Sequence, residues 1–278
     1  MTANPERMLF ASTTQAFLQK EGSLSHVRGL HDSDVSFEKT WWQRAAELGW
    51  ASLLVPEELG GGSVSGDGVA DLALVAEQTG HTVAPGPLQS GTTATRTGSG
   101  YRIDGVKDRV EAGADSDAVL VVADCDGQIR QFLVPTNAPG VAVTPQNSVD
   151  LVKRYARVQF DGVEVDESAA VGTAEQTPDI IERQRQIAVV LQCAEIVGIL
   201  DAVLAMTNQW LFDRHSFGRP LASYQALKHR AADMKMWFEA CRATTAGAAA
   251  AVSNRSADAR KLVSIAKAYV ADRAPVIL

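Results

Sequence analysis

The chain has 278 residues, of which 46% are hydrophobic, so it can bury a core large enough for two or three domains. Its formal net charge of −7 offers no basic field to a polyanion, which argues against a nucleic-acid partner. The N-terminus is polar without a signal-peptide core, and no apolar run looks long enough to span a bilayer, so we expect a cytoplasmic protein without a membrane span.

The three cysteines, Cys125, Cys193 and Cys241, are far apart in sequence and lack Cys-x-x-Cys spacing. This argues against a zinc site and against a disulfide framework, and we expect buried thiols in a reducing compartment and no bound metal.

The first part of the chain has the apolar periodicity of helices. Residues 5–21 predict a helix closed by Gly22, and residues 37–48 and about 69–79 predict two more. The glycine run 60–62 follows no strand and precedes no Lys-Ser/Thr pair, so it predicts a flexible connector and not a phosphate loop.

Residues 101–171 change to strand-like periodicity. Asp104-Gly105 is a hairpin signal, and short β-rich runs follow with Gly, Pro and Asp between them. The runs are AVLVVAD, QIRQFLVP, GVAVTP and YARVQFDGVEV. They predict a small β domain.

Helical periodicity returns at Asp179 and continues to the end of the chain. One apolar stripe runs from Ile187 to Leu204 and a second from Leu227 to Ala248, the second helix being predicted to begin with Ser223 as its N-cap. A third helix is predicted over residues 257–272, ended by Pro275. Three such helices predict a bundle, with the first two antiparallel because their link is short.

The link between the first two bundle helices lies in Leu211–Met234, LFDRHSFGRPLASYQALKHRAADM, and carries candidate binding residues. Arg214 can pair with a phosphate or carboxylate, Ser216 is a small hydroxyl donor, and Phe217 offers an aromatic face. Gln225 adds an amide suited to the edge of a base. The alternative is an ordinary helical hairpin with a solvated Arg and Gln and a core Phe.

This link resembles the corresponding stretch of the acyl-CoA dehydrogenases, flavoproteins that desaturate acyl thioesters. The resemblance lies in Arg-x-x-Phe-Gly, then Pro-Leu, then Ser-x-Gln-Ala-x-x-His-x-x-Ala-Asp-Met. Leu-Gly-Trp followed by Val-Pro-Glu-Glu-x-Gly-Gly near residues 48–61 is similar to the N-terminal domain of the same family. The resemblance implies an α+β fold with an N-terminal helical domain over 1–90, a central β domain over 91–175 and a C-terminal helical bundle over 176–278.

The resemblance also implies FAD as cofactor. In the family, the loop matching Arg214, Ser216, Phe217 and Gln225 grips the pyrophosphate and adenine end of an FAD held mainly by a neighbouring subunit. A segment of the β domain faces the flavin ring there with an aromatic and a hydroxyl residue. Here Arg109 and Glu111 stand where Trp and Thr are more usual, so this surface departs from the family pattern.

Desaturation needs a carboxylate that takes the proton alpha to the thioester while hydride leaves the beta carbon for the flavin. Glu182 and Glu195 are the candidates on the helix where some members keep this base, although ungapped counting places neither at the expected position. Arg183 and Arg185 are candidates for the substrate-side arginine with the same offset. A solvated helix face is the alternative for all four.

Two parts of the family pattern are not found in this sequence. In the family, several tens of residues separate the Ala-Pro-Gly-Pro region from the first hairpin, whereas here Gln89-Ser90 runs almost directly into it. The segment is either deleted from this protein or omitted from the sequence. A Gln-x-x-Gly-Gly turn, which binds the partner's flavin in the family and is followed in many members by the catalytic Glu, is not reached before Leu278. We therefore expect that the chain as written does not desaturate acyl-CoA alone.

These observations favour an FAD-dependent acyl-CoA dehydrogenase subunit. Some family members that act on bulky steroid acyl-CoAs have two unlike subunits, of which one bears the base, and this chain is similar to the other. The expected partners are an acyl-CoA substrate, a related subunit in a homo- or hetero-oligomer such as a dimer of dimers, and an electron-transfer partner. The alternative function is a non-catalytic binding subunit of such a complex.

Overall fold

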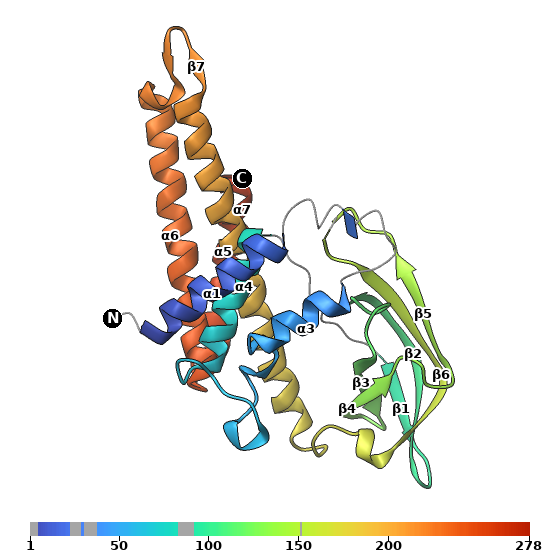
Figure 1. Ribbon diagram of the computed structural model, residues 1–278. Helices are drawn as coiled ribbons and strands as arrows, with labels where there is room; N and C mark the ends of the chain where they lie inside the picture. Colours follow the sequence, from blue (N-terminus) through green and yellow to red (C-terminus); the bar gives the residue numbers. More distant parts are fainter. Residues whose placement is uncertain (1–4, 23–28, 31–37, 83–91, 151) are drawn as a thin grey trace. The chain divides into compact units, whose positions relative to one another are not determined.

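The structure is a computed structural model, which describes residues 5–22, 29–30, 38–82, 92–150 and 152–278. The chain forms two compact units, described separately below (Figure 1). A helical unit comprises Met1–Leu24, Thr40–Val83 and Arg185–Leu278, and a sheet unit comprises Ser25–Lys39 and Ala84–Gln184.

The N-terminal segment is helical, as its periodicity predicts. Its elements are α1 (Pro5–Glu21), α3 (Lys39–Glu47), the 3-10 turns η1 (Trp50–Ser52) and η2 (Glu57–Leu59), and α4 (Gly68–Thr82). The rings of Trp41 and Trp50 both lie 5.6 Å from the ring of Phe17, measured between centroids. The predicted start of the second helix, Phe37, and the junction at Gln89-Ser90 lie outside the described residues.

The glycine-rich connector before α4 is anchored by one buried carboxylate. Asp71 is fully buried and accepts hydrogen bonds from the hydroxyl of Ser63 at 2.8 Å and from both the amide and the hydroxyl of Ser65 at 2.9 and 2.7 Å. The guanidinium of Arg7 lies 3.7 Å away. The connector that the sequence predicts to be flexible is thus fixed to α4 by these bonds.

The sheet unit contains a six-stranded mixed sheet in the order β4-β3-β1-β2-β6-β5. The strands are β1 (Thr92–Arg96), β2 (Gly100–Glu111), β3 (Ala118–Cys125), β4 (Gln128–Pro135), β5 (Val141–Gln146) and β6 (Tyr155–Asp166). All neighbours pair antiparallel except β1 with β3, which pair parallel over two residues. A parallel βαβ arrangement is not seen in this sheet.

The predicted hairpin at Asp104-Gly105 is wrong. These residues lie inside β2, where the register against β6 shifts between Ile103 and Gly105 and Gly105 has φ 134°. The Asp-Gly pair therefore forms a bulge, because both flanking halves of β2 find partners on the long strand β6. The chain reverses before β2 instead, between Arg96 and Gly100.

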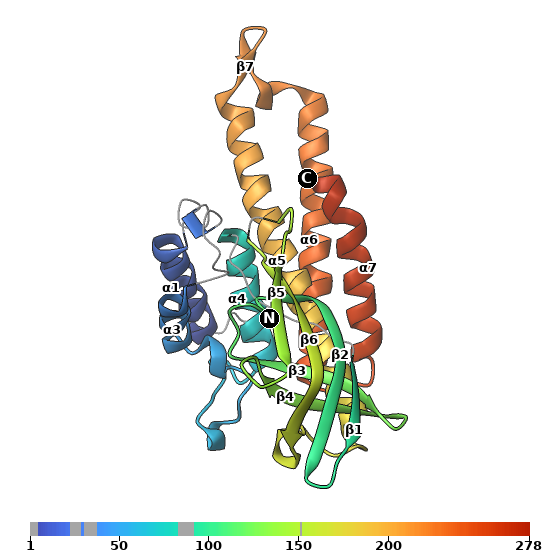
Figure 2. The same cartoon turned by 90° about the vertical axis from the view of Figure 1, so that its right-hand side faces the viewer.

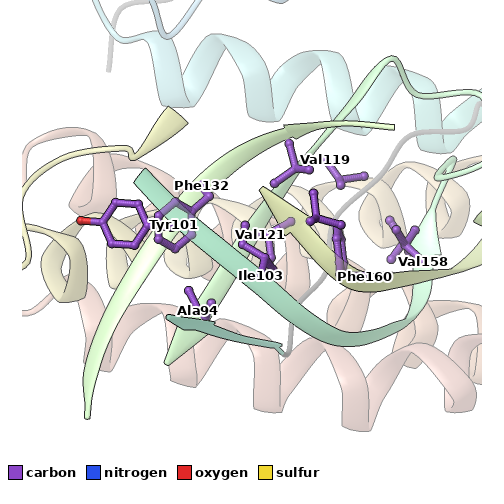
Figure 3. Close-up of a cluster of buried hydrophobic side chains, with 12 residues drawn as sticks. Ala94, Tyr101, Ile103, Val119, Val121, Phe132, Val158 and Phe160 are labelled. Atoms are coloured by element: carbon purple, nitrogen blue, oxygen red, sulfur yellow. The ribbon is translucent and has the colours of Figure 1, made fainter. Parts of the chain in front are cut away.

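The inward faces of these strands form one core. Figure 3 shows Tyr101 packed against Phe132, with ring centroids 4.8 Å apart, and Ile103, Val121 and Phe160 filling the space beyond them. The alternation of buried and exposed residues along β3 and β6 accounts for the strand-like pattern in the sequence.

The C-terminal part consists of α5 (Thr177–Asp213), α6 (Gln225–Ser253) and α7 (Ala259–Ile277). Val190 and Ala194 of α5 cluster with the C-terminal half of α6, and Val197 and Leu200 cluster with its N-terminal half. The two helices are therefore antiparallel, as predicted, and Figures 1 and 2 show them side by side with α7 along α6.

Two details of these helices differ from expectation. Pro275 does not end α7, which continues to Ile277, and the amide of Leu278 still donates to the carbonyl of Ala274. The helix α5 contains an 18-residue window of mean hydropathy 2.2, 39% of it buried, so by length and composition alone it could cross a membrane. The expectation that no apolar run is long enough is therefore wrong, although residues such as Val197 pack in a core.

The predicted fold class is confirmed: N-terminal helices, a central sheet and C-terminal helices follow one another along the chain. The boundaries at 90/91 and 175/176 stay predictions.

Candidate functional site

The link between α5 and α6 folds into a two-residue β-hairpin. Strand β7 (His215–Ser216) pairs with β8 (Arg219–Pro220), and Phe217 and Gly218 form the turn. Both turn residues have positive φ, 51° and 78°, as a type I′ turn requires. Figure 1 shows the hairpin at the far end of the paired helices α5 and α6.

Phe217 is held in a conformation that a bulky residue rarely adopts. Its side chain is 96% exposed, so the alternative reading of this residue as a core phenylalanine is wrong. A non-glycine residue at positive φ, with its aromatic ring in solvent, gains nothing from packing within the chain. Strained and exposed residues of this kind cluster at ligand-binding sites.

The hairpin is fixed to the helices by backbone and side-chain bonds. The amide of Leu221 donates to the carbonyl of Arg214 at 2.8 Å, and the hydroxyl of Ser223 donates to the carbonyl of Pro220 at 2.7 Å. The prediction that Ser223 is the N-cap of the second helix is therefore wrong. Tyr224 occupies that position without a side-chain cap, because Ser223 lies in the 3-10 turn η4 (Leu221–Ser223) and bonds backwards.

The polar side chains around the hairpin suit a phosphate and a base. Arg214 is exposed, and within the described part of the chain its guanidinium has no carboxylate partner. Ser216 is half-buried, and Gln225 is exposed with its amide nitrogen 2.8 Å from Nε2 of His229. An unpaired guanidinium, a hydroxyl, an amide and an aromatic face fit a pyrophosphate joined to adenine. The four residues predicted for FAD thus lie on one short segment.

Large apolar side chains are exposed around this end of the helices. Besides Phe217, they are Met206, Trp210 and Phe212 on α5 and Met236 on α6. Met206 and Trp210 are four residues apart and share one face of α5. Several large apolar side chains exposed on one helix pair are typical of an interaction site.

The candidate bases lie far from the hairpin. Since a helix rises about 1.5 Å per residue, Glu195 lies about 27 Å and Glu182 about 47 Å before Asp213, the last residue of α5. Both are half-buried and both have an interaction partner, as do Arg183 and Arg185. The structure thus brings the four hairpin residues together and leaves these four charged residues elsewhere on α5.

The end of β2 has the unusual geometry that its sequence suggests. Arg109 has φ 55°, and its amide donates to Oε1 of Gln146 at 3.0 Å. Glu111 is buried, with Lys153 3.4 Å from its carboxylate. A charged pair and a strained arginine replace an aromatic and a hydroxyl residue, so this segment does not fit a flavin ring in the usual way. Lys153 was not identified from the sequence, since its partner is 42 positions away.

Two family models match this chain. The N-terminal domain of acyl-CoA dehydrogenase matches residues 4–100, and the C-terminal domain of acyl-CoA dehydrogenase matches residues 185–277. The chain belongs to the acyl-CoA dehydrogenase family. The proteins of this family are FAD-binding flavoproteins, in agreement with the predicted cofactor, and one structural neighbour is PigA with FAD and proline.

Mycobacterial proteins are among the relatives that this chain resembles. The acyl-CoA dehydrogenase IpdE2 is 29% identical in Mycobacterium tuberculosis, covering 95% of this chain and 82% of the relative, and 30% identical in Mycolicibacterium smegmatis, covering 91% and 79%. The ChsE4-ChsE5 complex from Mycobacterium tuberculosis superposes with a TM-score of 0.85 at 23% identity, covering 99% of this chain and 86% of that one. The structure of the Tcur3481-Tcur3483 steroid ACAD superposes with a TM-score of 0.81 at 21% identity. The match covers 98% of this chain and 86% of that one.

Proposed function

We propose that this chain is an FAD-dependent acyl-CoA dehydrogenase subunit that acts on bulky, steroid-derived acyl thioesters. The relatives support the reaction, and the likeness to a steroid enzyme supports the substrate class. When bound, FAD accepts the hydride that leaves the beta carbon of the acyl group. The residues of this chain bind and orient it.

The observation that carries the proposal is the β7–β8 hairpin. Arg214, which has no carboxylate partner among the described residues, and Phe217 at positive φ lie at one end of α5 and α6. A cation, a hydroxyl and an amide can hold phosphate and adenine, yet they offer nothing that tunes a flavin ring. Arg214, Ser216, Phe217 and Gln225 therefore bind the pyrophosphate and adenine half of an FAD.

That FAD belongs mostly to a second subunit in this proposal. The candidate bases Glu195 and Glu182 lie about 27 and 47 Å back along α5, so the hairpin and these carboxylates serve different reaction centres. Apolar residues such as Trp210 and Met206 provide the surface for the second subunit. The assembly is a homo- or hetero-oligomer, and an electron-transfer partner reoxidises the flavin.

The visible spectrum of the purified assembly tests the proposal. Wild type is expected to show the flavin bands near stoichiometric occupancy, and Arg214→Ala is expected to lose most of them after gel filtration. Arg230→Ala, which removes an exposed arginine from α6 outside the hairpin, is the matched control and should retain flavin. Equal flavin content in all three proteins would contradict the assignment.

A second candidate function, a binding subunit without redox chemistry of its own, is favoured by the end of β2. The buried Glu111 beside Lys153 and the strained Arg109 do not present an aromatic and a hydroxyl side chain to a flavin ring. Anaerobic flavin bleaching by bulky acyl-CoA thioesters separates the two functions. Bleaching by the chain alone, abolished by Glu182→Gln or Glu195→Gln, would identify the base. Bleaching only with an unlike subunit present would favour the binding role.

A further inference from the structure

One side chain outside the β7–β8 hairpin contacts both of its strands. The hydroxyl of Tyr224 donates a 2.8 Å hydrogen bond to the carbonyl of Ser216 on β7. The guanidinium of Arg219 on β8 lies over the ring of Tyr224, with Cζ 4.0 Å from the ring centroid. Ser216 and Arg219 are the pair that closes the turn. Tyr224 therefore joins the two strands at the base of the turn.

The bond to Ser216 bears directly on Phe217. The carbonyl of Ser216 belongs to the peptide group that precedes Phe217, so fixing its direction restricts the rotation that brings Phe217 to φ 51°. Phe217 has almost no packing of its own, because its side chain is 96% exposed. Its conformation must therefore be imposed by neighbouring bonds, of which this is one.

The stacking contact bears on Arg219. A guanidinium placed over an aromatic ring is held by a cation–π contact, and the N–H donors at its edge stay available to bind a phosphate. Arg219 is exposed, and among the described residues no carboxylate pairs with it. Tyr224 thus holds an unpaired cation as well as the exposed aromatic residue.

We propose that Tyr224 is a positioning residue for the flavin site, holding Phe217 and Arg219 where they meet the pyrophosphate and adenine half of FAD. This inference rests on the proposed function. Tyr224 lies just before α6 (Gln225–Ser253), so its side chain connects the start of this helix to both strands of the hairpin. Without it, both residues keep their chemistry and lose their fixed orientation.

Two substitutions separate the contributions of Tyr224. Tyr224→Phe removes the hydroxyl and leaves the ring under Arg219, whereas Tyr224→Leu removes both contacts. Tyr269→Phe, which deletes a hydroxyl from a residue packed beside α7's core, is the matched control. Each assembly is stripped of flavin and titrated with FAD and, separately, with FMN, which lacks the adenine half.

The dissociation constant for FAD is expected to rise five- to tenfold in Tyr224→Phe and further in Tyr224→Leu. The FMN constant should not change, because FMN cannot reach the hairpin, whereas general unfolding of the site would weaken both flavins. Amide hydrogen exchange at Phe217 and Gly218 should be faster in both variants before any flavin is added. Tyr269→Phe should match wild type in every measurement.

The possible failures are distinct. Unchanged FAD affinity and unchanged exchange in Tyr224→Phe, with flavin still lost from Arg214→Ala, would overturn the role of Tyr224 and leave the proposed function standing. A wild-type assembly that binds no FAD would overturn the proposed function and the flavin role of Tyr224 with it. Parallel loss of FAD and FMN affinity would reduce Tyr224 to a structural residue.

Discussion

The ammonium of Lys107 on β2 donates a 2.6 Å hydrogen bond to the carbonyl oxygen of Val122 on β3. Lys107 is 2% exposed, and burial alone lowers its pKa from 10.5 to about 8. Thr92 Oγ1 approaches the same carbonyl at 3.3 Å. A cation is thus buried at the point where the short strand β1 enters the sheet, with a carbonyl in place of a carboxylate.

This lysine gives stability a defined pH dependence. Because its pKa is lowered on folding, the unfolded chain binds more protons between pH 8 and 10.5, so the free energy of unfolding contributed by Lys107 rises with pH across that window. The gain in the free energy of unfolding is about 3 kcal/mol in total; it begins near pH 8 and is complete above pH 10.5. Urea unfolding at pH 7, 8.5 and 10 measures it. The difference in free energy of unfolding between wild type and Lys107→Met isolates the contribution of Lys107. A difference that stays constant with pH would contradict the prediction.

Asp71 is expected to be the main stabilising residue of the connector before α4. Asp71→Ala leaves the hydroxyls of Ser63 and Ser65 and the amide of Ser65 without their acceptor, which should lower the free energy of unfolding by about 3 kcal/mol. Asp71→Asn keeps one carbonyl oxygen and should lose about half as much. Limited proteolysis should cut the Ala variant between residues 60 and 66 first. An uncut connector in Asp71→Ala would mean that other contacts hold it.

The bulge in β2 should tolerate only glycine at position 105. Gly105 has φ 134°, and an added Cβ would lie 2.4 Å from Cγ2 of Thr92. Gly105→Ala should therefore destabilise the chain by about 3 kcal/mol through strain and overlap. Gly127 is the matched control, with φ 81° and open space around it, so Gly127→Ala should lose only about 1 kcal/mol. Thermal unfolding compares the stability of the two variants. Equal losses of stability would show that backbone strain, and not the overlap with Thr92, sets the cost at Gly105.

Most elements could be predicted because their signal is local. The run QIRQFLVP matches β4 (Gln128–Pro135), and the helices follow from their apolar period. By contrast, β1 (Thr92–Arg96) was missed, because only Ala94 is buried in it and its neighbours β2 and β3 create its pairing. Asp104-Gly105 was misread since the same dipeptide serves a turn or a bulge, and only the length of the partner strand decides.

In the candidate site, too, local features could be predicted from the sequence and features that depend on the folded structure could not. Arg214, Ser216, Phe217 and Gln225 could be predicted because they follow one another within a short motif. The positive φ of Phe217 and the contacts of Tyr224 could not be predicted, since they depend on how the hairpin closes in space. Nor does the sequence show that Lys107 is buried, because a lysine in a strand ordinarily faces solvent.

The exposed apolar face at the end of α5 should control assembly. Met206 and Trp210 are 71% and 60% exposed and lie one turn apart, so a subunit interface there would bury both. Trp210→Glu places a charge in that interface, and it should weaken association at least tenfold without lowering the melting temperature of the subunit, since Trp210 has little packing to lose. Asn208→Glu, a change at an exposed residue on another face of α5, is the charge control and should assemble like wild type. Sedimentation over a range of concentrations measures the effect. If Trp210→Glu assembles as wild type does, the subunit interface does not include this face of α5.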